Sequence, residues 1–254
     1  MHKGDVAGLD IGSRSVELVV LQNGRTVHRN KLPTAFDPLG QCHLLMAEVA
    51  VPLVVATGYG RKLFKEHFSG IGAKVITEIQ AYAVGARVFY PQARTVLDIG
   101  GQDTKAIALA ADGRTLKFEM NDRCAAGTGK FLEFMATALQ IPIAEFGNFA
   151  LQADRRITIS NTCTVFAETE ATSLMARGET TANIAMGLHA AIISRTLAML
   201  NRVGAAAPLV FAGGVAHNAC IVKLLEEKLG YAVQVPDDPD FTGAYGAAHY
   251  GLVS

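Results

Sequence analysis

The feature that most constrains the fold of this chain is a short segment that occurs twice. Residues 9–21 align with residues 97–109, and each copy carries the tripeptide Asp-Ile-Gly, beginning at Asp10 and at Asp98. Each copy is an apolar run, a turn and a second apolar run, followed by an Asn-Gly or Asp-Gly pair that is typical of a β-hairpin. The repeat therefore predicts two related halves, each opening with a three-stranded meander.

After each meander, helical and strand-like patterns alternate. An interruption at Tyr90-Pro91-Gln92 predicts domains of residues 1–91 and 92–254, with the last helix able to pack back on the first lobe. Strands alternating with helices in two duplicated halves predict an α/β fold of two lobes with a nucleotide cleft between them. We expect strands at 52–57, 74–76, 208–212 and 233–235, and helices at 78–89, 125–139, 166–177, 181–202, 218–229 and 243–252.

Composition and charge narrow the possible partners. The 23 basic and 23 acidic residues cancel, which leaves no electrostatic footprint for nucleic acid or an anionic membrane. No apolar run approaches the roughly 18 residues that a membrane helix needs, and the first residues do not read as a signal peptide. We therefore expect a cytoplasmic protein that binds neither nucleic acid nor a membrane.

The two Asp-Ile-Gly turns predict a phosphate site. Glycine lets the backbone approach a ligand closely, so that its amides can point at an anion, and an Asp before the turn can hold a hydrated magnesium ion. A single such turn could be an ordinary hairpin, but its repetition favours two turns that grip one triphosphate. We predict Asp10 and Asp98 as catalytic residues that hold magnesium through water. The predicted phosphate contacts are Gly12, Ser13, Gly100, Gly101, Gln102 and Asp103.

A third glycine cluster predicts an adenosine site. Gly213 and Gly214 follow a predicted strand and precede a predicted helix, so a flat adenosine could lie on bare backbone there, with Asn218 beside it. Residues 124–131 look like a P-loop, but the first glycine is replaced by Cys124 and the final Ser/Thr by Phe131. Because the hydroxyl that would bind magnesium is missing, we reject that interpretation.

The order of these motifs resembles the superfamily of actin, the sugar kinases and the heat-shock chaperone ATPases over nearly the whole chain. The resemblance implies two duplicated ribonuclease H-like lobes, the actin-like ATPase fold, with ATP or ADP and magnesium between them. Small-residue helices at 78–86 and 243–248 would then cross closely as a hinge. The fold serves kinases, filaments and chaperones, so it does not by itself identify the reaction.

The four cysteines, at 42, 124, 163 and 220, form no Cys-x-x-Cys pair, so neither a disulfide nor a zinc finger is predicted. Cys124 and Cys163 are each predicted at a helix start after an asparagine, Asn121 or Asn161. A helix N-terminus favours the thiolate, and two thiolates from each chain of a dimer would complete a four-iron cluster. The residues alone also allow two small buried cysteines in tight helix starts. We predict Cys42 and Cys220 as core residues.

A narrower resemblance bears on this choice. Residues 98–105, 121–133 and 161–163 together closely resemble the activator ATPases of 2-hydroxyacyl-CoA dehydratases, and residues 56–61 do so too. The same group, the BadF/BadG/BcrA/BcrD-type ATPases, includes the ATPase subunits of benzoyl-CoA reductases. The resemblance implies a homodimer with one [4Fe-4S] cluster held by Cys124 and Cys163 of each chain. It also implies ATP-driven transfer of one electron to a dehydratase- or reductase-type partner, from a donor such as ferredoxin or flavodoxin.

Two roles and two rival functions remain open from the sequence. Gln102 is predicted to position the water that attacks ATP. A small-molecule, sugar-type kinase could use the same cleft, with Asp103 as its candidate general base. A non-catalytic ATP-sensing protein with structural cysteines is the other alternative.

Overall fold

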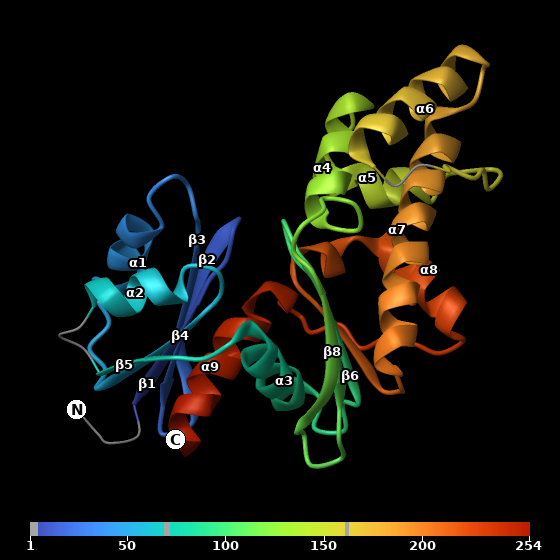
Figure 1. Ribbon diagram of the computed structural model, residues 1–254. Helices are drawn as coiled ribbons and strands as arrows, with labels where there is room; N and C mark the ends of the chain where they lie inside the picture. The colour runs from blue at the N-terminus through green and yellow to red at the C-terminus, as the bar shows by residue number, and fades with distance from the viewer. Residues whose placement is uncertain (1–4, 69–71, 161–162) are drawn as a thin grey trace. The chain divides into compact units, whose positions relative to one another are not determined.

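The computed structural model describes residues 5–68, 72–160 and 163–254, and two compact units can be recognised in it (Figure 1). Unit 1 comprises Met1–Val96, Leu109–Leu116 and Pro236–Ser254, and unit 2 comprises Leu97–Ala108 and Lys117–Val235. Each unit contains a β-sheet covered by helices. The fold is therefore mixed α/β, as the alternating sequence pattern predicts.

Unit 1 is built on a five-stranded sheet in the order β3-β2-β1-β4-β5. Strands β1, β2 and β3 form the predicted antiparallel meander, whereas β4 and β5 extend it in parallel to β1. The parallel strands follow from the helical crossovers that separate them in sequence. The strands are β1 (Val6–Ile11), β2 (Ser15–Gln22), β3 (Arg25–Pro33), β4 (Leu53–Thr57) and β5 (Gly72–Val75).

Both faces of this sheet are covered, which is why β1 is buried along its whole length. Leu9 and Ile11 point into the core beneath α1 (Pro38–Met46) and α2 (Arg61–His67). The opposite face carries Val19 and Leu21, which pack with residues of α9 (Thr242–Val253), and Figure 1 shows these helices on opposite sides of the sheet.

Close backbone approach joins α9 to its neighbours within unit 1. A Cβ atom on Gly8 of β1 would lie 2.0 Å from the Ala244 carbonyl oxygen of α9. Likewise, a Cβ atom on Gly246 would lie 1.8 Å from the Ala81 oxygen of α3 (Glu78–Phe89). The two small-residue helices predicted from the sequence therefore do pack closely against each other.

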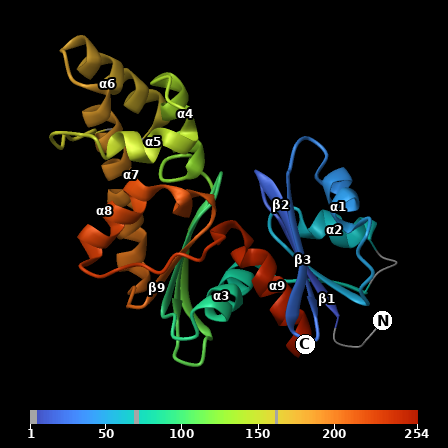
Figure 2. The ribbon, with the colours of Figure 1, turned by 180° about the vertical axis from the view of Figure 1, so that it is seen from behind.

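Unit 2 contains a four-stranded sheet in the order β8-β7-β6-β9, some of whose residues belong to unit 1. One large apolar core, with Phe131, Phe146 and Phe211 among its fully buried side chains, lies between the sheet and the helices (Figure 2). The strands are β6 (Thr95–Ile99), β7 (Thr104–Leu109), β8 (Thr115–Asn121) and β9 (Leu209–Ala212); the helices are α4 (Gly129–Ala138), α5 (Ile143–Ala150), α6 (Thr164–Ala176), α7 (Thr181–Val203) and α8 (Ala219–Leu229), with short 3₁₀ turns η1 (Gly214–His217) and, in unit 1, η2 (Pro239–Phe241).

Two predicted elements are wrong in detail. The helix expected at residues 125–139 begins only at Gly129, because Gly127 has a φ of +85° and Thr128 is extended, with φ −119° and ψ 170°. Neither conformation can continue a right-handed helix. The strand expected at 233–235 is reduced to an isolated parallel bridge between Val210 and Gln234.

The long helix α7 bears on the expectation that no apolar run is long enough for a membrane helix. By length and composition alone, Thr181–Val203 could cross a membrane. However, 67% of its most apolar stretch is buried inside the protein, where Ile184, Leu188 and Ile192 join the core of unit 2. The buried core helix of a globular unit can have the same length and apolar composition as a membrane helix.

Candidate functional site

The first predicted phosphate turn lies where β1 ends in unit 1. The Gly12 amide donates to the Ser15 carbonyl oxygen at 3.0 Å and closes the turn, and the Thr34 hydroxyl donates to the Gly12 oxygen at 2.7 Å. Asp10 is buried, with 4% of its surface exposed, whereas Gly12 is half-buried and Ser13 is exposed. The structure thus brings the three predicted residues together at the carboxyl end of β1, an edge where α/β sheets commonly bind ligands.

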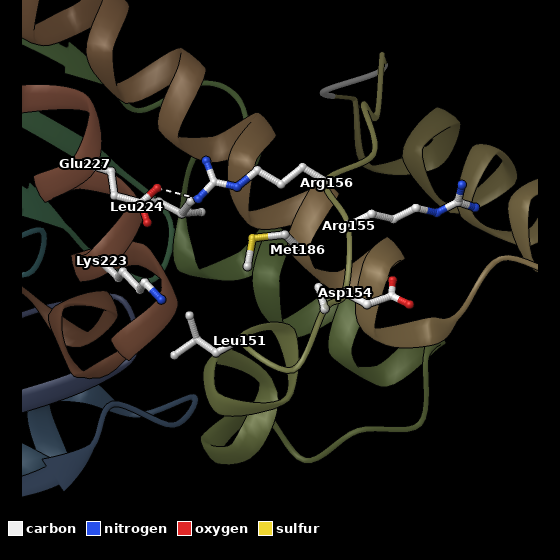
Figure 3. A pocket seen from close by; sticks show the side chains of 9 residues that line it. Leu151, Asp154, Arg155, Arg156, Met186, Lys223, Leu224 and Glu227 are labelled. Atoms are coloured by element: carbon white, nitrogen blue, oxygen red, sulfur yellow. Dashed lines mark hydrogen bonds and ion pairs between the residues drawn. The ribbon is translucent and has the colours of Figure 1, made fainter.

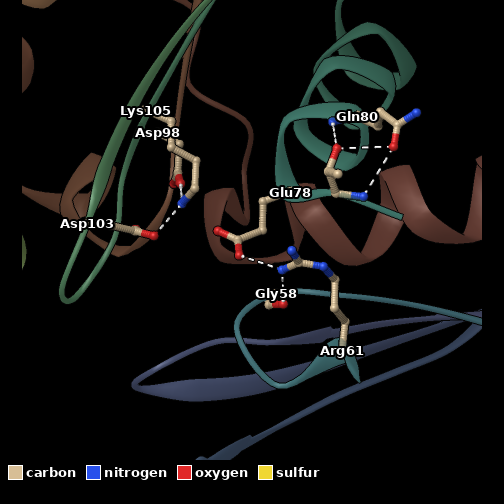
Figure 4. Close-up of polar contacts among 8 residues, drawn as sticks. Gly58, Arg61, Glu78, Gln80, Asp98, Asp103 and Lys105 are labelled. Atoms are coloured by element: carbon tan, nitrogen blue, oxygen red, sulfur yellow. Dashed lines mark hydrogen bonds and ion pairs between the residues drawn. The ribbon is translucent and has the colours of Figure 1, made fainter. Parts of the chain in front are cut away.

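Bare backbone surrounds the Asp10 carboxylate. Gly58, which follows the parallel strand β4, has a φ of +84°, and a Cβ atom there would lie 2.5 Å from Asp10 Oδ1 and 2.5 Å from the Ile11 oxygen. A Cβ atom on Gly243 of α9 would lie 1.9 Å from Asp10 Oδ2. Arg61 holds the Gly58 loop, because its Nη1 donates to the Gly58 oxygen at 2.7 Å (Figure 4).

The second turn, in unit 2, has the same backbone closure. The Gly100 amide donates to the Asp103 carbonyl oxygen at 3.0 Å. Gly213, after β9, has a φ of +81°, and its Cβ atom would lie 2.2 Å from Asp98 Oδ1 and 2.7 Å from the Ile99 oxygen. Gly213 therefore occupies the place that Gly58 occupies at the first turn. The sequence alignment of the two halves missed this equivalence.

The second turn differs from the first by a buried lysine that the sequence analysis did not select. Lys105 Nζ lies 3.0 Å from Asp98 Oδ2 and 2.8 Å from Asp103 Oδ2. Figure 4 shows Lys105 between the two carboxylates. Gly101 is half-buried and Gln102 is exposed, so both can be reached by a ligand at this turn.

Asn218, predicted beside the adenosine, has its side chain engaged within unit 2. Its Oδ1 accepts from the Ile221 amide at 3.0 Å and caps α8, while its Nδ2 lies 3.0 Å from Nε2 of His189 on α7. Burial lowers the pKa of His189 to about 4, and its Nδ1 lies 2.7 Å from the Ala185 oxygen. A neutral His189 that donates from Nδ1 accepts the Asn218 hydrogen bond at Nε2.

The four cysteines separate into two kinds. Cys42 and Cys220 are fully buried, as predicted, and burial raises the pKa of each thiol to about 12. Cys124 and Cys163 are exposed free thiols, both in unit 2, so their interpretation as buried residues in tight helix starts is wrong.

The local setting of the two exposed cysteines is only partly as predicted. Cys163 is the N-cap residue of α6, as expected, although Asn161 before it lies outside the described residues. Cys124 does not begin a helix, because α4 starts at Gly129. It lies instead in a loop whose Cys124 and Ala126 oxygens accept from Asn121 Nδ2 at 2.9 and 3.0 Å.

This cysteine loop, residues 122–128, is hydrogen-bonded to the second phosphate turn. The Thr104 hydroxyl donates to the Gly127 oxygen at 2.6 Å. Immediately after the loop, the amides of Gly129 and Lys130 donate to the oxygens of Gly100 and Gly101 at 2.9 and 2.8 Å. The turn and the loop that carries Cys124 therefore form one connected piece of backbone within unit 2.

A separate hollow of about 320 Å³ lies between the 151–156 loop, α7 and α8 of unit 2. An ion pair between Arg156 and Glu227 crosses its rim, and Met186 and Leu224 form apolar lining (Figure 3). None of the predicted phosphate, adenosine or cysteine residues lines it.

Comparison with known proteins shows the family of this chain. The model of the BadF/BadG/BcrA/BcrD ATPase family matches residues 7–251. The 2-hydroxyisocaproyl-CoA dehydratase activator of Clostridioides difficile is 36% identical over 254 residues, covering 96% of this chain and 94% of the relative.

Solved structures give the same result. Component A of (R)-2-hydroxyglutaryl-CoA dehydratase from Acidaminococcus fermentans has a TM-score of 0.90 at 34% identity, with 98% of each chain covered. The 2-hydroxyisocaproyl-CoA dehydratase activator from Clostridium difficile with bound ADPNP has a TM-score of 0.87 at 35% identity, covering 98% of this chain and 94% of that one. A ROK family glucokinase from Streptomyces griseus, at 13% identity and a TM-score of 0.63, shares the fold alone. The chain has the actin-like ATPase fold and belongs to the BadF/BadG/BcrA/BcrD ATPase family.

Proposed function

We propose that this ATPase activates a dehydratase- or reductase-type iron–sulfur enzyme by coupling ATP binding and hydrolysis to the transfer of one electron. The relatives named as activators of 2-hydroxyacyl-CoA dehydratases support the class of partner. The observation that carries the proposal is the set of hydrogen bonds that ties the cysteine loop to the second phosphate turn. Through these bonds, a ligand at the turn acts directly on the backbone beside Cys124.

In this proposal each of the two units offers ATP one glycine turn. Asp10 and Asp98 hold magnesium through water, and the glycines packed on their carboxylates leave space that a side chain would fill. Gln102, which is exposed at its turn, positions the attacking water. Phosphates lie along Gly12, Ser13, Gly100, Gly101, Gln102 and Asp103, and the adenosine lies along Gly213, Gly214 and the start of α8 at Asn218.

The thiols of Cys124 and Cys163 suit a shared [4Fe-4S] cluster. Iron–sulfur clusters are held by four cysteine thiolates, and a homodimer supplies two exposed cysteines from each chain. When bound, the cluster supplies a single electron at low potential. Asn121 holds the Cys124 loop through two carbonyl oxygens, so this side chain keeps the ligand in place.

The coupling follows from differential affinity. A ligand shifts a conformational equilibrium only by binding one state better than the other. ATP therefore has to favour the arrangement of Gly100 and Gly101 that belongs to the electron-donating state. Their oxygens accept from Gly129 and Lys130, so a changed turn moves the end of the cysteine loop and the first turn of α4.

Anaerobic purification and absorption spectroscopy test the cluster. We expect a broad band at about 400 nm that bleaches on reduction and disappears in Cys124→Ser and in Cys163→Ser. Cys42→Ala and Cys220→Ala are matched controls that keep the band, because both thiols are buried in the core. Protein that stays colourless after anaerobic reconstitution would overturn the redox function and leave the ATPase intact.

The remaining parts of the proposal concern assembly and partners. We expect a homodimer in light scattering, with a cytoplasmic location and a donor such as ferredoxin or flavodoxin. Mixing the reduced protein with a candidate dehydratase and ATP should restore dehydratase activity. A Cys163→Ser protein that restores it equally well would contradict electron transfer through the cysteines.

A further inference from the structure

The two predicted phosphate turns are closed by the same kind of backbone hydrogen bond but differ in the charge of their side chains. Each is closed by a 3.0 Å bond, from Gly12 to Ser15 and from Gly100 to Asp103. At the first turn, the residue paired with Asp10 across the strands is Glu17, and both are 4% exposed. The aligned residue of the second copy is Lys105.

Lys105 therefore turns an acid–acid pair into an ion-paired cluster. Lys105 is 2% exposed and Asp98 is 1% exposed, and the lysine Nζ contacts Asp98 Oδ2 at 3.0 Å and Asp103 Oδ2 at 2.8 Å. The three groups together carry one negative charge. Without the ammonium they would carry two, next to the place where a polyanion is proposed to bind.

The same lysine also contacts both ends of the turn. Asp103 closes the turn through its carbonyl oxygen, and its Oδ1 lies where a Cβ atom on Gly100 would come within 2.9 Å. Asp98 precedes the turn and Asp103 ends it, so Lys105 joins its two ends through side chains. A single side chain thus pairs with the carboxylates on both sides of residues 99–102.

We propose that Lys105 is a positioning residue of the second phosphate turn, where it pairs with Asp98 and Asp103 so that the turn accepts ATP phosphates instead of repelling them. This role rests on the proposed placement of ATP at the turn. Lys105 acts through the two carboxylates and the turn backbone. The first turn has Glu17 at the equivalent position, and the residue paired with Glu17 on β3 is Lys31.

Lys105→Met removes the charge and keeps an unbranched side chain that is one atom shorter. We expect ATP affinity without magnesium to fall by about tenfold or more, because two carboxylates of like charge then face the phosphates. Excess magnesium should narrow the gap, since the released carboxylates attract the cation. A purely structural role for Lys105 would weaken ATP binding equally at every magnesium concentration.

A second variant keeps the proposal testable if Lys105→Met does not fold. The double variant Lys105→Met/Asp103→Asn restores the single negative charge of the wild-type cluster. We expect the double variant to bind ATP at least about threefold more tightly than Lys105→Met does. A folded double variant that binds ATP no better than Lys105→Met would overturn the proposal.

Isothermal titration with ATP, with and without magnesium, measures all these variants. Asp98→Asn and Gly100→Ala distinguish the placement of ATP at this turn from the role of Lys105. If neither changes ATP affinity, the placement of ATP at this turn is wrong. If both weaken ATP binding while Lys105→Met binds as wild type at every magnesium concentration, only the role of Lys105 is wrong.

Discussion

Replacing Gly213 by alanine tests how the second phosphate turn is built. Gly213 has a φ of +81°, and an added methyl group would lie 2.2 Å from Asp98 Oδ1 and 2.7 Å from the Ile99 oxygen. One of these neighbours is backbone, so the clash cannot be relieved by turning a side chain alone. The sheet end, the Asp98 carboxylate and the start of η1 have to shift together.

The magnitude can be worked out from two contributions. Gly213 combines its φ of +81° with a ψ of 169°, a backbone region that is essentially restricted to glycine and costs another residue about 1–3 kcal/mol. Forcing an extra methyl group into a packed site adds about 1–3 kcal/mol. Together they predict that Gly213→Ala lowers the free energy of unfolding by about 2–6 kcal/mol. Gly230→Ala is a control for positive φ without packing, because Gly230 is left-handed with a φ of +78° and has nothing within 4 Å of its Cβ position.

Chemical denaturation and ATP titration together check this prediction. Gly230→Ala should lose only the backbone contribution of about 1–2 kcal/mol and bind ATP as wild type does. Gly213→Ala should lose more stability than the control, and its ATP affinity should fall because the Asp98 carboxylate is displaced. Equal losses of stability in the two variants would refute the close packing of Gly213 on the turn.

Three further outcomes follow from contacts elsewhere in the two units. The folded-state pKa of His189 is about 4, below its ordinary value of 6.5, so the free energy of unfolding should fall by up to about 3 kcal/mol as pH drops from 6.5 to 4. If the difference in free energy of unfolding between wild type and His189→Gln does not change with pH, this prediction is contradicted. Thr104→Val removes the 2.6 Å hydrogen bond to the Gly127 oxygen, which should lower the free energy of unfolding by about 1–3 kcal/mol and speed hydrogen exchange in residues 122–128. Unchanged hydrogen exchange would contradict the view that the turn holds this loop. Gly246→Ala should lower the melting temperature, because its Cβ would lie 1.8 Å from the Ala81 oxygen; an unchanged melting temperature would show that α3 and α9 can separate at no cost.

Elements with local signals were predictable from the sequence. The helix expected at residues 78–89 coincides with α3, because Thr77 and Gln80 form a capping box that lies within four consecutive residues. The meanders at the start of each half were predictable for the same reason, since hairpin turns and alternating strands are short-range patterns. The wrong start of α4 has an equally local cause, but it depends on the backbone conformation of Gly127 and Thr128, which the apolar pattern does not report.

The sequence by itself determined the duplicated Asp-Ile-Gly turns, the α/β class, the actin-like ATPase family and the core positions of Cys42 and Cys220. Tertiary structure alone decided that Gly58 and Gly213 are equivalent, since each follows the strand whose end meets the turn, β4 in one unit and β9 in the other. It also decided that Lys105 joins Asp98 to Asp103. The physical reason is that turns and caps depend on neighbouring residues, whereas sheet order and burial bring together side chains that are distant in the sequence.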